Sequence, residues 1–108
     1  MNDDLVDLLD YQDVLAAVVA TPDGLLVLSA GLDGEDADIV AAAGSVVAGA
    51  LTTPERPFAS VDTEGGRLHV AAGDMVLLMV LAEETAPSEA VETALQERLA
   101  TLEVALAP

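Results

Sequence analysis

The side chains best suited to catalysis in this sequence are one histidine and four serines. A histidine-rich metal site cannot form around a single imidazole, His69, and a Ser-His-Asp triad would need a serine beside it. None of the serines lies in a Gly-x-Ser-x-Gly nucleophile elbow; they are Ser29, Ser45, Ser60 and Ser88. Cysteine is absent, which removes thiolate nucleophiles and sulfur metal ligands. We therefore predict no catalytic residue and a protein that is not an enzyme.

Acidic side chains gather at Asp33, Glu35, Asp36 and Asp38. A calcium-binding loop needs the order Asp-x-Asp-x-Asp-Gly and a terminal glutamate, and both are missing here. Carboxylates in the first turn of a helix complement its dipole, so we interpret this cluster as a solvated helix start. The sequence also has no glycine-rich loop with a lysine for nucleotide phosphates, and we expect neither a metal nor a cofactor.

The charge balance excludes several classes of partner. Three basic residues stand against twenty acidic ones, and the formal net charge is −17. Nucleic acids and anionic membrane surfaces offer no counter-charge to such a chain, so we expect binding to neither. Hydrophobic residues make up 53% of the chain, which predicts a folded protein, yet no apolar run reaches the roughly 18 residues of a membrane span. The acidic start shows no signal-peptide pattern, which predicts a cytoplasmic location.

Hydrophobic periodicity predicts eight elements in a single domain over residues 1–108. They are a helix over 2–13, strands over 14–20 and 25–30, a helix over 35–51, strands over 58–61, 67–72 and 75–82, and a helix from Ser88. The order α-β-β-α-β-β-β-α predicts an α+β fold with an antiparallel five-stranded sheet between helices.

The burial of each strand is predicted from its own pattern. The runs 14–20 and 25–30 are almost continuously apolar, which predicts a central strand pair covered on both faces. The most hydrophobic run, 75–82, is expected near the sheet centre. In 67–72, Arg67 and His69 alternate with apolar residues, so this strand is expected to have a solvated face with His69 on the sheet surface.

The predicted helix over 35–51 carries no charged residue after Asp38. A helix that is apolar on all sides must be buried on more than one side, and a domain of this size supplies only one sheet face. Small side chains repeat along it at i, i+4 spacing, which lets two helix backbones approach closely. These ridges are Ala37, Ala41, Ser45 and Gly49, with Ala41, Gly44 and Ala48 beside them. The helix therefore predicts a partner, which we take to be a second copy of the chain.

Three turns and their spacing resemble the roadblock-type dynein light chain family over nearly the whole chain. They are Thr21-Pro22-Asp23-Gly24-Leu25, Gly65-Gly66-Arg67-Leu68 and Gly73-Asp74-Met75-Val76-Leu77. The longin and profilin-like domains share much of this architecture. The resemblance implies a cytoplasmic homodimer in which the second helix packs on its symmetry mate and the next strand extends the sheet across the interface. Prokaryotic members regulate or scaffold small Ras-like GTPases, and those of the MglB type activate GTP hydrolysis, which implies such a partner here.

Candidate interface residues come from this helix and from the strand after it, whose edge would be unprotected in a monomer. They are Ala37, Val40, Ala41, Gly44, Ser45, Val47, Ala48, Leu51, Phe58 and Ser60. Arg56 and Glu55, in the loop before that strand, are candidate partner-binding residues, and Arg56 is the exposed candidate for an arginine finger. An ion pair of Arg56 with Glu55 or another acid is the preferred alternative for this arginine.

The predicted function is a non-catalytic homodimeric interaction module that binds and regulates, or activates, a small Ras-like GTPase. The alternative is a small-ligand sensor or a general scaffold of profilin-like architecture, and an uncharacterised enzyme is a third hypothesis. Sensors usually enclose an apolar pocket with converging polar groups, whereas this chain is only 2% aromatic and shows no buried polar pattern. The enzyme hypothesis lacks a nucleophile, metal ligands and a tuned acid–base pair.

Overall fold

The computed structural model describes residues 2–11 and 13–106, which form a single α+β domain. Its elements are α1 (Asn2–Leu8), β1 (Val14–Ala20), β2 (Leu26–Ala30), α2 (Gly34–Leu51), β3 (Phe58–Thr63), β4 (Gly66–Ala72), β5 (Leu77–Ala82) and α3 (Ser88–Leu106). The predicted α+β class, element order and antiparallel five-stranded sheet are confirmed.

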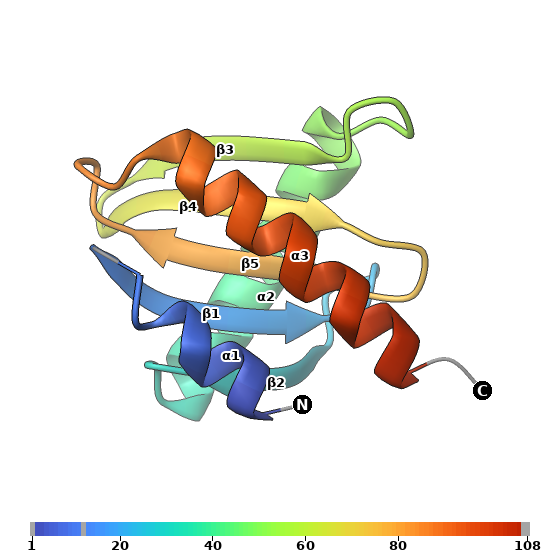
Figure 1. Cartoon of the computed structure of the whole chain (residues 1–108), viewed down its shortest axis with the longest axis horizontal. Coiled ribbons are helices and arrows are strands. Elements are labelled where there is room, and N and C mark those ends of the chain that lie inside the picture. The colour runs from blue at the N-terminus through green and yellow to red at the C-terminus, as the bar shows by residue number, and fades with distance from the viewer. Residues whose placement is uncertain (1, 12, 107–108) are drawn as a thin grey trace.

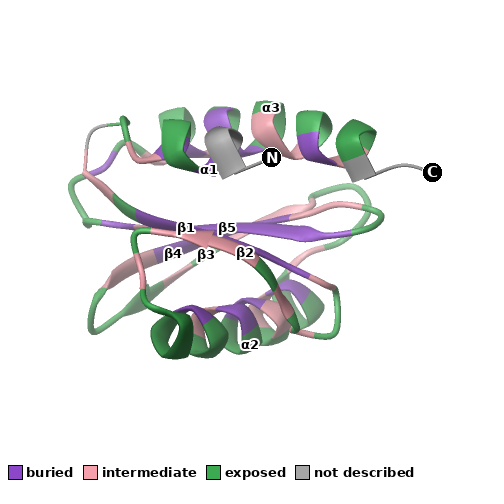
Figure 2. Ribbon diagram, turned by 90° about the horizontal axis from the view of Figure 1, so that it is seen from below, coloured by how far each residue is buried: buried purple, intermediate pink, exposed green. Residues whose placement is uncertain are grey.

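The sheet lies between two helical layers (Figure 1). Its strand order is β2-β1-β5-β4-β3, and every pairing is antiparallel. The helices α1 and α3 cover one face, whereas α2 crosses the other and contacts all five strands (Figure 2). One hydrophobic cluster forms on each face, and β1 and β5 contribute to both. Val19 and Leu78 belong to the cluster under α1 and α3, whereas Val18 and Met79 belong to the cluster under α2.

The first helix is shorter than predicted and ends at Leu8. The backbone N–H groups of Leu9, Asp10 and Tyr11 each donate to the carbonyl three residues earlier, at 3.0, 3.1 and 3.3 Å. These tighter bonds end the α-helix, and Asp13 then adopts a φ of 64° that directs the chain into β1. Position 12 of the predicted helix lies outside the described residues.

The strand β2 is an edge strand, so the prediction that 14–20 and 25–30 form a central pair is wrong for the second run. Its ladder with β1 is irregular: Val19 pairs with Leu28 and Ala20 with Leu26, which leaves Val27 as a bulge. Leu26 and Leu28 consequently pack on opposite faces of the sheet. The continuous apolar pattern of this run therefore reflects a bulge at an edge.

The prediction that the run 75–82 lies near the sheet centre is confirmed, because β5 lies between β1 and β4. The strand starts at Leu77, two residues later than predicted, since the backbone N–H of Gly73 donates to the carbonyl of Val76 in a tight turn. The Glu103 carboxylate of α3 accepts the Met75 N–H at 3.1 Å, which fixes this turn to the helix above it.

The helix α2 is capped by Asp33, whose side chain accepts a hydrogen bond from the Asp36 N–H at 2.8 Å. Its buried stripe consists of small residues that bring the helix close to the sheet: Ala37, Ala41, Gly44 and Ala48. A Cβ atom added at Gly44 would overlap the Sδ of Met79 on β5. The absence of a side chain at Gly44 therefore sets the distance between α2 and β5.

Substituting the two glycines inside α2 tests this close approach. Gly44→Ala is expected to lower the free energy of unfolding by about 1 kcal/mol, because the added methyl group overpacks the buried Met79 side chain. Gly49→Ala is the matched control: its methyl group meets nothing within 4 Å, and the gain in helix propensity is expected to raise stability by about 0.5–1 kcal/mol. Urea denaturation measures both variants. Equal stability of the two variants would contradict the close packing of Gly44 against Met79.

Candidate functional site

From Ile39 to Leu51, the outward face of α2 is apolar and uncharged. Ile39, Ala43, Val46 and Ala50 recur at the spacing i, i+4, i+7, i+11, and all four are exposed. Ile39 is 61% exposed and Val46 is 72% exposed, and Leu51 at the end of the helix is 53% exposed. Figure 2 shows this exposed side of α2 turned away from the sheet. A contiguous apolar stripe on so acidic a chain is a candidate protein–protein interface.

The structure corrects which side of α2 the small residues occupy. The predicted interface residues Ala37, Ala41, Gly44 and Ala48 are buried against the chain's own sheet. These four small residues, which we expected to meet a symmetry mate, therefore pack internally, whereas Gly49 of the predicted ridge is exposed. The outward stripe is offset from the buried one by two residues, which is about half a helical turn. Of the other predicted residues in the helix, Val40, Ser45 and Val47 are half-buried.

The strand β3 is the second edge of the sheet and is in contact with α2. In the described part of the chain it pairs with β4 alone, so its outer backbone groups have no strand partner. Phe58 packs partly against the cluster under α1 and α3, and Ser60 is exposed. These two predicted interface residues therefore lie on the edge strand, with their side chains on the face of the sheet opposite α2.

Arg56 and Glu55 lie exposed in the loop that leads into β3. The backbone N–H of Arg56 donates to the Thr53 hydroxyl at 3.0 Å, which holds the loop in a turn. The preferred ion pair of Arg56 with Glu55 or another acid is not formed within residues 2–11 and 13–106. The Arg56 guanidinium is therefore open to a partner.

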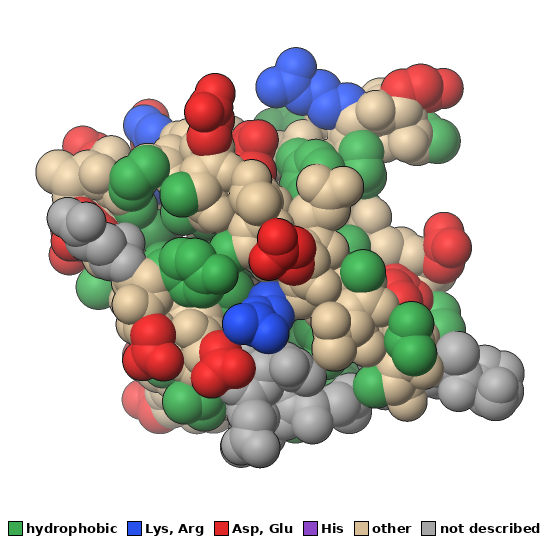
Figure 3. All heavy atoms as spheres, viewed as in Figure 1, with side chains coloured by type: hydrophobic (Ala, Val, Ile, Leu, Met, Phe, Trp, Pro, Cys, Tyr) green, Lys and Arg blue, Asp and Glu red, His purple; other side chains and the backbone are tan. Residues whose placement is uncertain are grey.

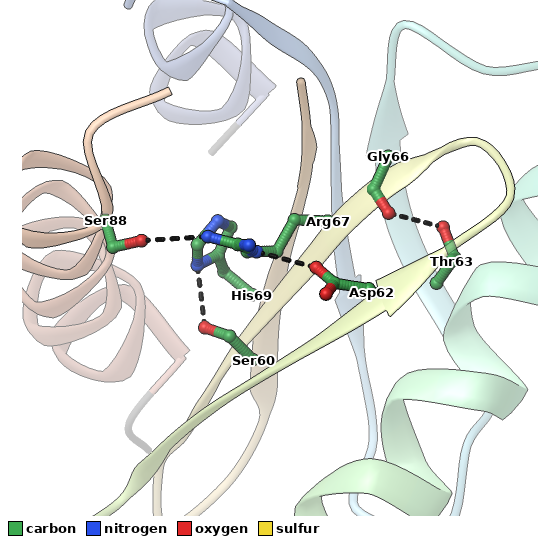
Figure 4. Close-up of polar contacts among 7 residues, drawn as sticks. All are labelled: Ser60, Asp62, Thr63, Gly66, Arg67, His69 and Ser88. Carbon is green, nitrogen blue, oxygen red and sulfur yellow. Dashed lines mark hydrogen bonds and ion pairs between the residues drawn. The ribbon is translucent and has the colours of Figure 1, made fainter. Parts of the chain in front are cut away.

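His69 is buried, and the prediction of a solvated strand face is wrong. It is 1% exposed because α3 packs over this face of β4. Its Nδ1 lies 2.8 Å from the Ser60 hydroxyl of β3, whereas its Nε2 has no hydrogen-bond partner among the described residues (Figure 4). Arg67, on the same face, donates from Nε to Asp62 at 2.8 Å. The alternation of 67–72 shows which residues share a face, but the helix that covers this face lies further along the sequence.

Burial lowers the pKa of His69 below its ordinary value of 6.5, because desolvation disfavours the imidazolium. The positive charge of Arg67 lowers this pKa further, whereas Glu92 on α3 acts in the opposite direction. The hydrogen bond that Arg67 donates to the Asp62 carboxylate raises the pKa of Arg67. His69 is therefore neutral in the folded chain at neutral pH.

Ser60 and His69 do not reproduce the geometry of a catalytic triad. In a triad, one ring nitrogen of histidine faces the serine and a carboxylate holds the other. Here the second nitrogen, Nε2, has no such partner in the part of the chain that the structure describes. Two surface hollows, with volumes of about 460 and 320 Å³, are lined by residues of other loops and turns, and neither includes Ser60 or His69.

Outside α2, exposed large apolar side chains are spread over several elements, with Val6, Leu25 and Val104 among them. On the face formed by α1 and α3, acidic side chains are scattered among apolar ones (Figure 3). No group of three or more His, Asp or Glu side chains in the described ranges is arranged to hold a metal ion. The described helices include none long and apolar enough to cross a membrane. The outward face of α2 and the adjoining edge of β3 are thus the candidate site, and the recognition they offer is apolar packing and strand pairing.

No protein-family model and no curated protein matches this sequence. Solved structures match nearly its whole length. A Roadblock/LC7 domain from Streptomyces avermitilis has a TM-score of 0.89 at 20% identity and covers 100% of this chain and 98% of its own. A second Roadblock/LC7 domain from that organism has a TM-score of 0.75 at 26% identity, over 93% of this chain and 95% of its own.

MglB from Myxococcus xanthus has a TM-score of 0.77 at 17% identity, over 97% of this chain and 95% of its own. A further MglB structure has a tetrameric arrangement. The matches extend through every helix and strand, so the resemblance of the three turns is confirmed for the fold. The chain therefore has the fold of the Roadblock/LC7 domain.

Proposed function

We propose that this chain is a cytoplasmic, non-catalytic homodimeric interaction module that binds and regulates a small Ras-like GTPase. The observation that carries the proposal is the outward face of α2, which is uncharged from Ile39 to Leu51 on a chain with a net charge of −17. Two such chains repel each other least where neither presents charge. The fold shared with MglB, which has been solved in a tetrameric arrangement, supports self-association.

The outward stripe of α2 is self-complementary in size. Large and small side chains alternate along it, in the order Ile39, Ala43, Val46 and Ala50. Two copies of α2 packed antiparallel about a two-fold axis near residues 44 and 45 would place each Ile39 opposite Ala50 of the other copy. The same axis would place each Ala43 opposite Val46. Every large side chain then meets a small one, as close packing requires.

The edge of β3 continues this proposed interface. Because β3 lies beside α2, two copies that pack through α2 can also pair their β3 edges and extend the sheet. The opposite edge is less suited to pairing, because β2 has five residues and a bulge, whereas β3 has six residues in unbroken register. The proposed dimer therefore uses α2, which ends at Leu51, together with β3, which carries Phe58 and Ser60.

The GTPase part of the proposal is supported by the fold shared with MglB and by the turns that resemble its family. A chain with this excess of acids requires a basic patch on such a partner. Exposed Arg56 can meet an acidic group of the GTPase at the edge of the contact. A regulator that reshapes the switch regions of a GTPase needs no arginine finger, and we place Arg56 in binding.

Exchanging the sizes of two outward residues tests the proposed pairing of α2. We expect Val46→Ala, which leaves a void, and Ala43→Val, which overpacks, each to weaken the dimer about tenfold. The double variant Ala43→Val/Val46→Ala is expected to recover to within about threefold of the wild type, because large again meets small. Val104→Ala is the control, because Val104 is 79% exposed on α3, and it should leave the affinity of the dimer unchanged.

Light scattering after size exclusion and sedimentation equilibrium measure these affinities at low and at high salt, since screening reduces the repulsion between acidic chains. A wild-type chain that stays at its monomer mass of 11.0 kDa in both salts would contradict the dimer. If the double variant weakens the dimer as much as the two single variants do together, the antiparallel pairing is contradicted, but the dimer itself is not.

A small Ras-like GTPase from the source organism, loaded with GDP or a non-hydrolysable GTP analogue, tests the second part of the proposal. Val46→Arg is expected to abolish GTPase binding because it breaks the dimer, whereas the control Val104→Arg retains it. Arg56→Ala is expected to weaken binding to the GTPase. Any acceleration of GTP hydrolysis should be unchanged once the variant saturates the GTPase. Calorimetry and phosphate release measure the two effects. Full binding by monomeric Val46→Arg would place the GTPase on another face, and loss of acceleration by Arg56→Ala would make this arginine a finger.

A further inference from the structure

The strand β3 is attached to β4 differently on its two faces. On the face under α2, the cross-strand neighbours are apolar: Ala59 with Val70 and Val61 with Leu68. On the face under α3, Phe58 pairs with the apolar Ala71, whereas the next two pairs are polar: Ser60 with His69, and Asp62 with Arg67. The edge proposed to meet a second copy is therefore held on one face by a hydrogen bond to a buried imidazole.

The surroundings of His69 fit only its neutral form. From β3, Ser60 faces the ring, and Asp62 is already paired with Arg67 of β4. From α3, Glu92 is the acidic group that acts on the ring, while Arg67 donates to Ser88 at 3.5 Å. The neighbour of His69 on β5 is Val80, which offers no polar side chain. The ring nitrogen Nε2, buried without a partner among these groups, has no acceptor for a second proton.

Protonation of His69 therefore requires a new hydrogen-bond acceptor for the ring, either a water molecule or a carboxylate that has moved. An imidazolium has two N–H donors, and an uncompensated buried cation is costly. The strands β4 and β5 each have a neighbour on both sides, whereas β3 has only one. Movement of β3, which is held by one neighbouring strand, would admit water to His69 and would disturb the edge that pairs in the proposed dimer.

We propose that protonation of His69 is a switch that loosens β3 from β4 and thereby weakens self-association through this edge. The inference rests on the proposed dimer, whose regulation it describes. The direction of the effect follows from linkage. In the closed state, with β3 paired to β4 over His69, the pKa of His69 lies below its ordinary value of 6.5. The closed state is therefore favoured above pH 6.5 and loses that advantage as the pH falls below this value. Ordinary carboxylates, with pKa values near 4, do not titrate in this range.

The direction distinguishes the switch from general charge effects. Any loss of negative charge on acidification would strengthen the association of two chains that each carry −17. The switch predicts the opposite between pH 7.5 and 5.5. At constant ionic strength, the dimer dissociation constant is expected to rise at least about threefold over this range. His69→Asn, which cannot titrate and keeps an amide near Ser60, should show no such rise.

Because His69 is the only histidine, its imidazole NMR signal can be followed in the unmodified chain. By linkage, its pKa must be lower at concentrations where the dimer dominates than in dilute monomer. This measurement decides the question even when His69→Asn fails to fold. Equal pKa values in the two states, or an equally tight wild-type dimer at pH 5.5, would overturn the switch and leave the dimer standing. A wild-type monomer at every concentration at pH 7.5 would overturn the proposed function itself.

Discussion

The structure depends on covering both faces of its central strands. β1 and β5 bury side chains on both faces, so the sheet is stable only between two helical layers. The chain supplies α2 for one face and α1 with α3 for the other. The outer side of α2 and the two sheet edges are what this arrangement leaves uncovered in the described residues. The surfaces available for recognition are therefore a consequence of how the core is built.

Most of the architecture could be predicted from the sequence because it is encoded locally. The turn at Pro22 and Gly24, the capped start of α2 and the apolar run of β5 each act within a few residues. The position of β2 in the sheet could not be predicted from the sequence, because a bulge at Val27 and burial on both faces give the same apolar pattern. The burial of His69 depends on where α3 docks, and alternation within β4 carries no information about that.

Several of the interface residues predicted on α2 lie on the side of the helix that is buried against the sheet. An alanine-rich helix contains several stripes of small residues, and periodicity alone cannot tell which of them faces the sheet. Met79 makes that choice, because its side chain fills the space that Gly44 leaves open. Once this contact fixes the rotation of α2, Ile39 and Val46 must point outward, and the outward stripe gains the large residues that an interface needs.

The proposed switch depends on the difference between the two faces of the β3–β4 pair. Apolar neighbours such as Val61 and Leu68 are insensitive to protons, whereas the Ser60–His69 hydrogen bond includes an imidazole that can gain a proton. An apolar pair at the position of His69 would hold the strand without an unsatisfied nitrogen. Placing the polar pairs on an edge strand, and keeping the central ladder of β1 and β5 apolar, confines any response to the side of the sheet where a partner strand can add.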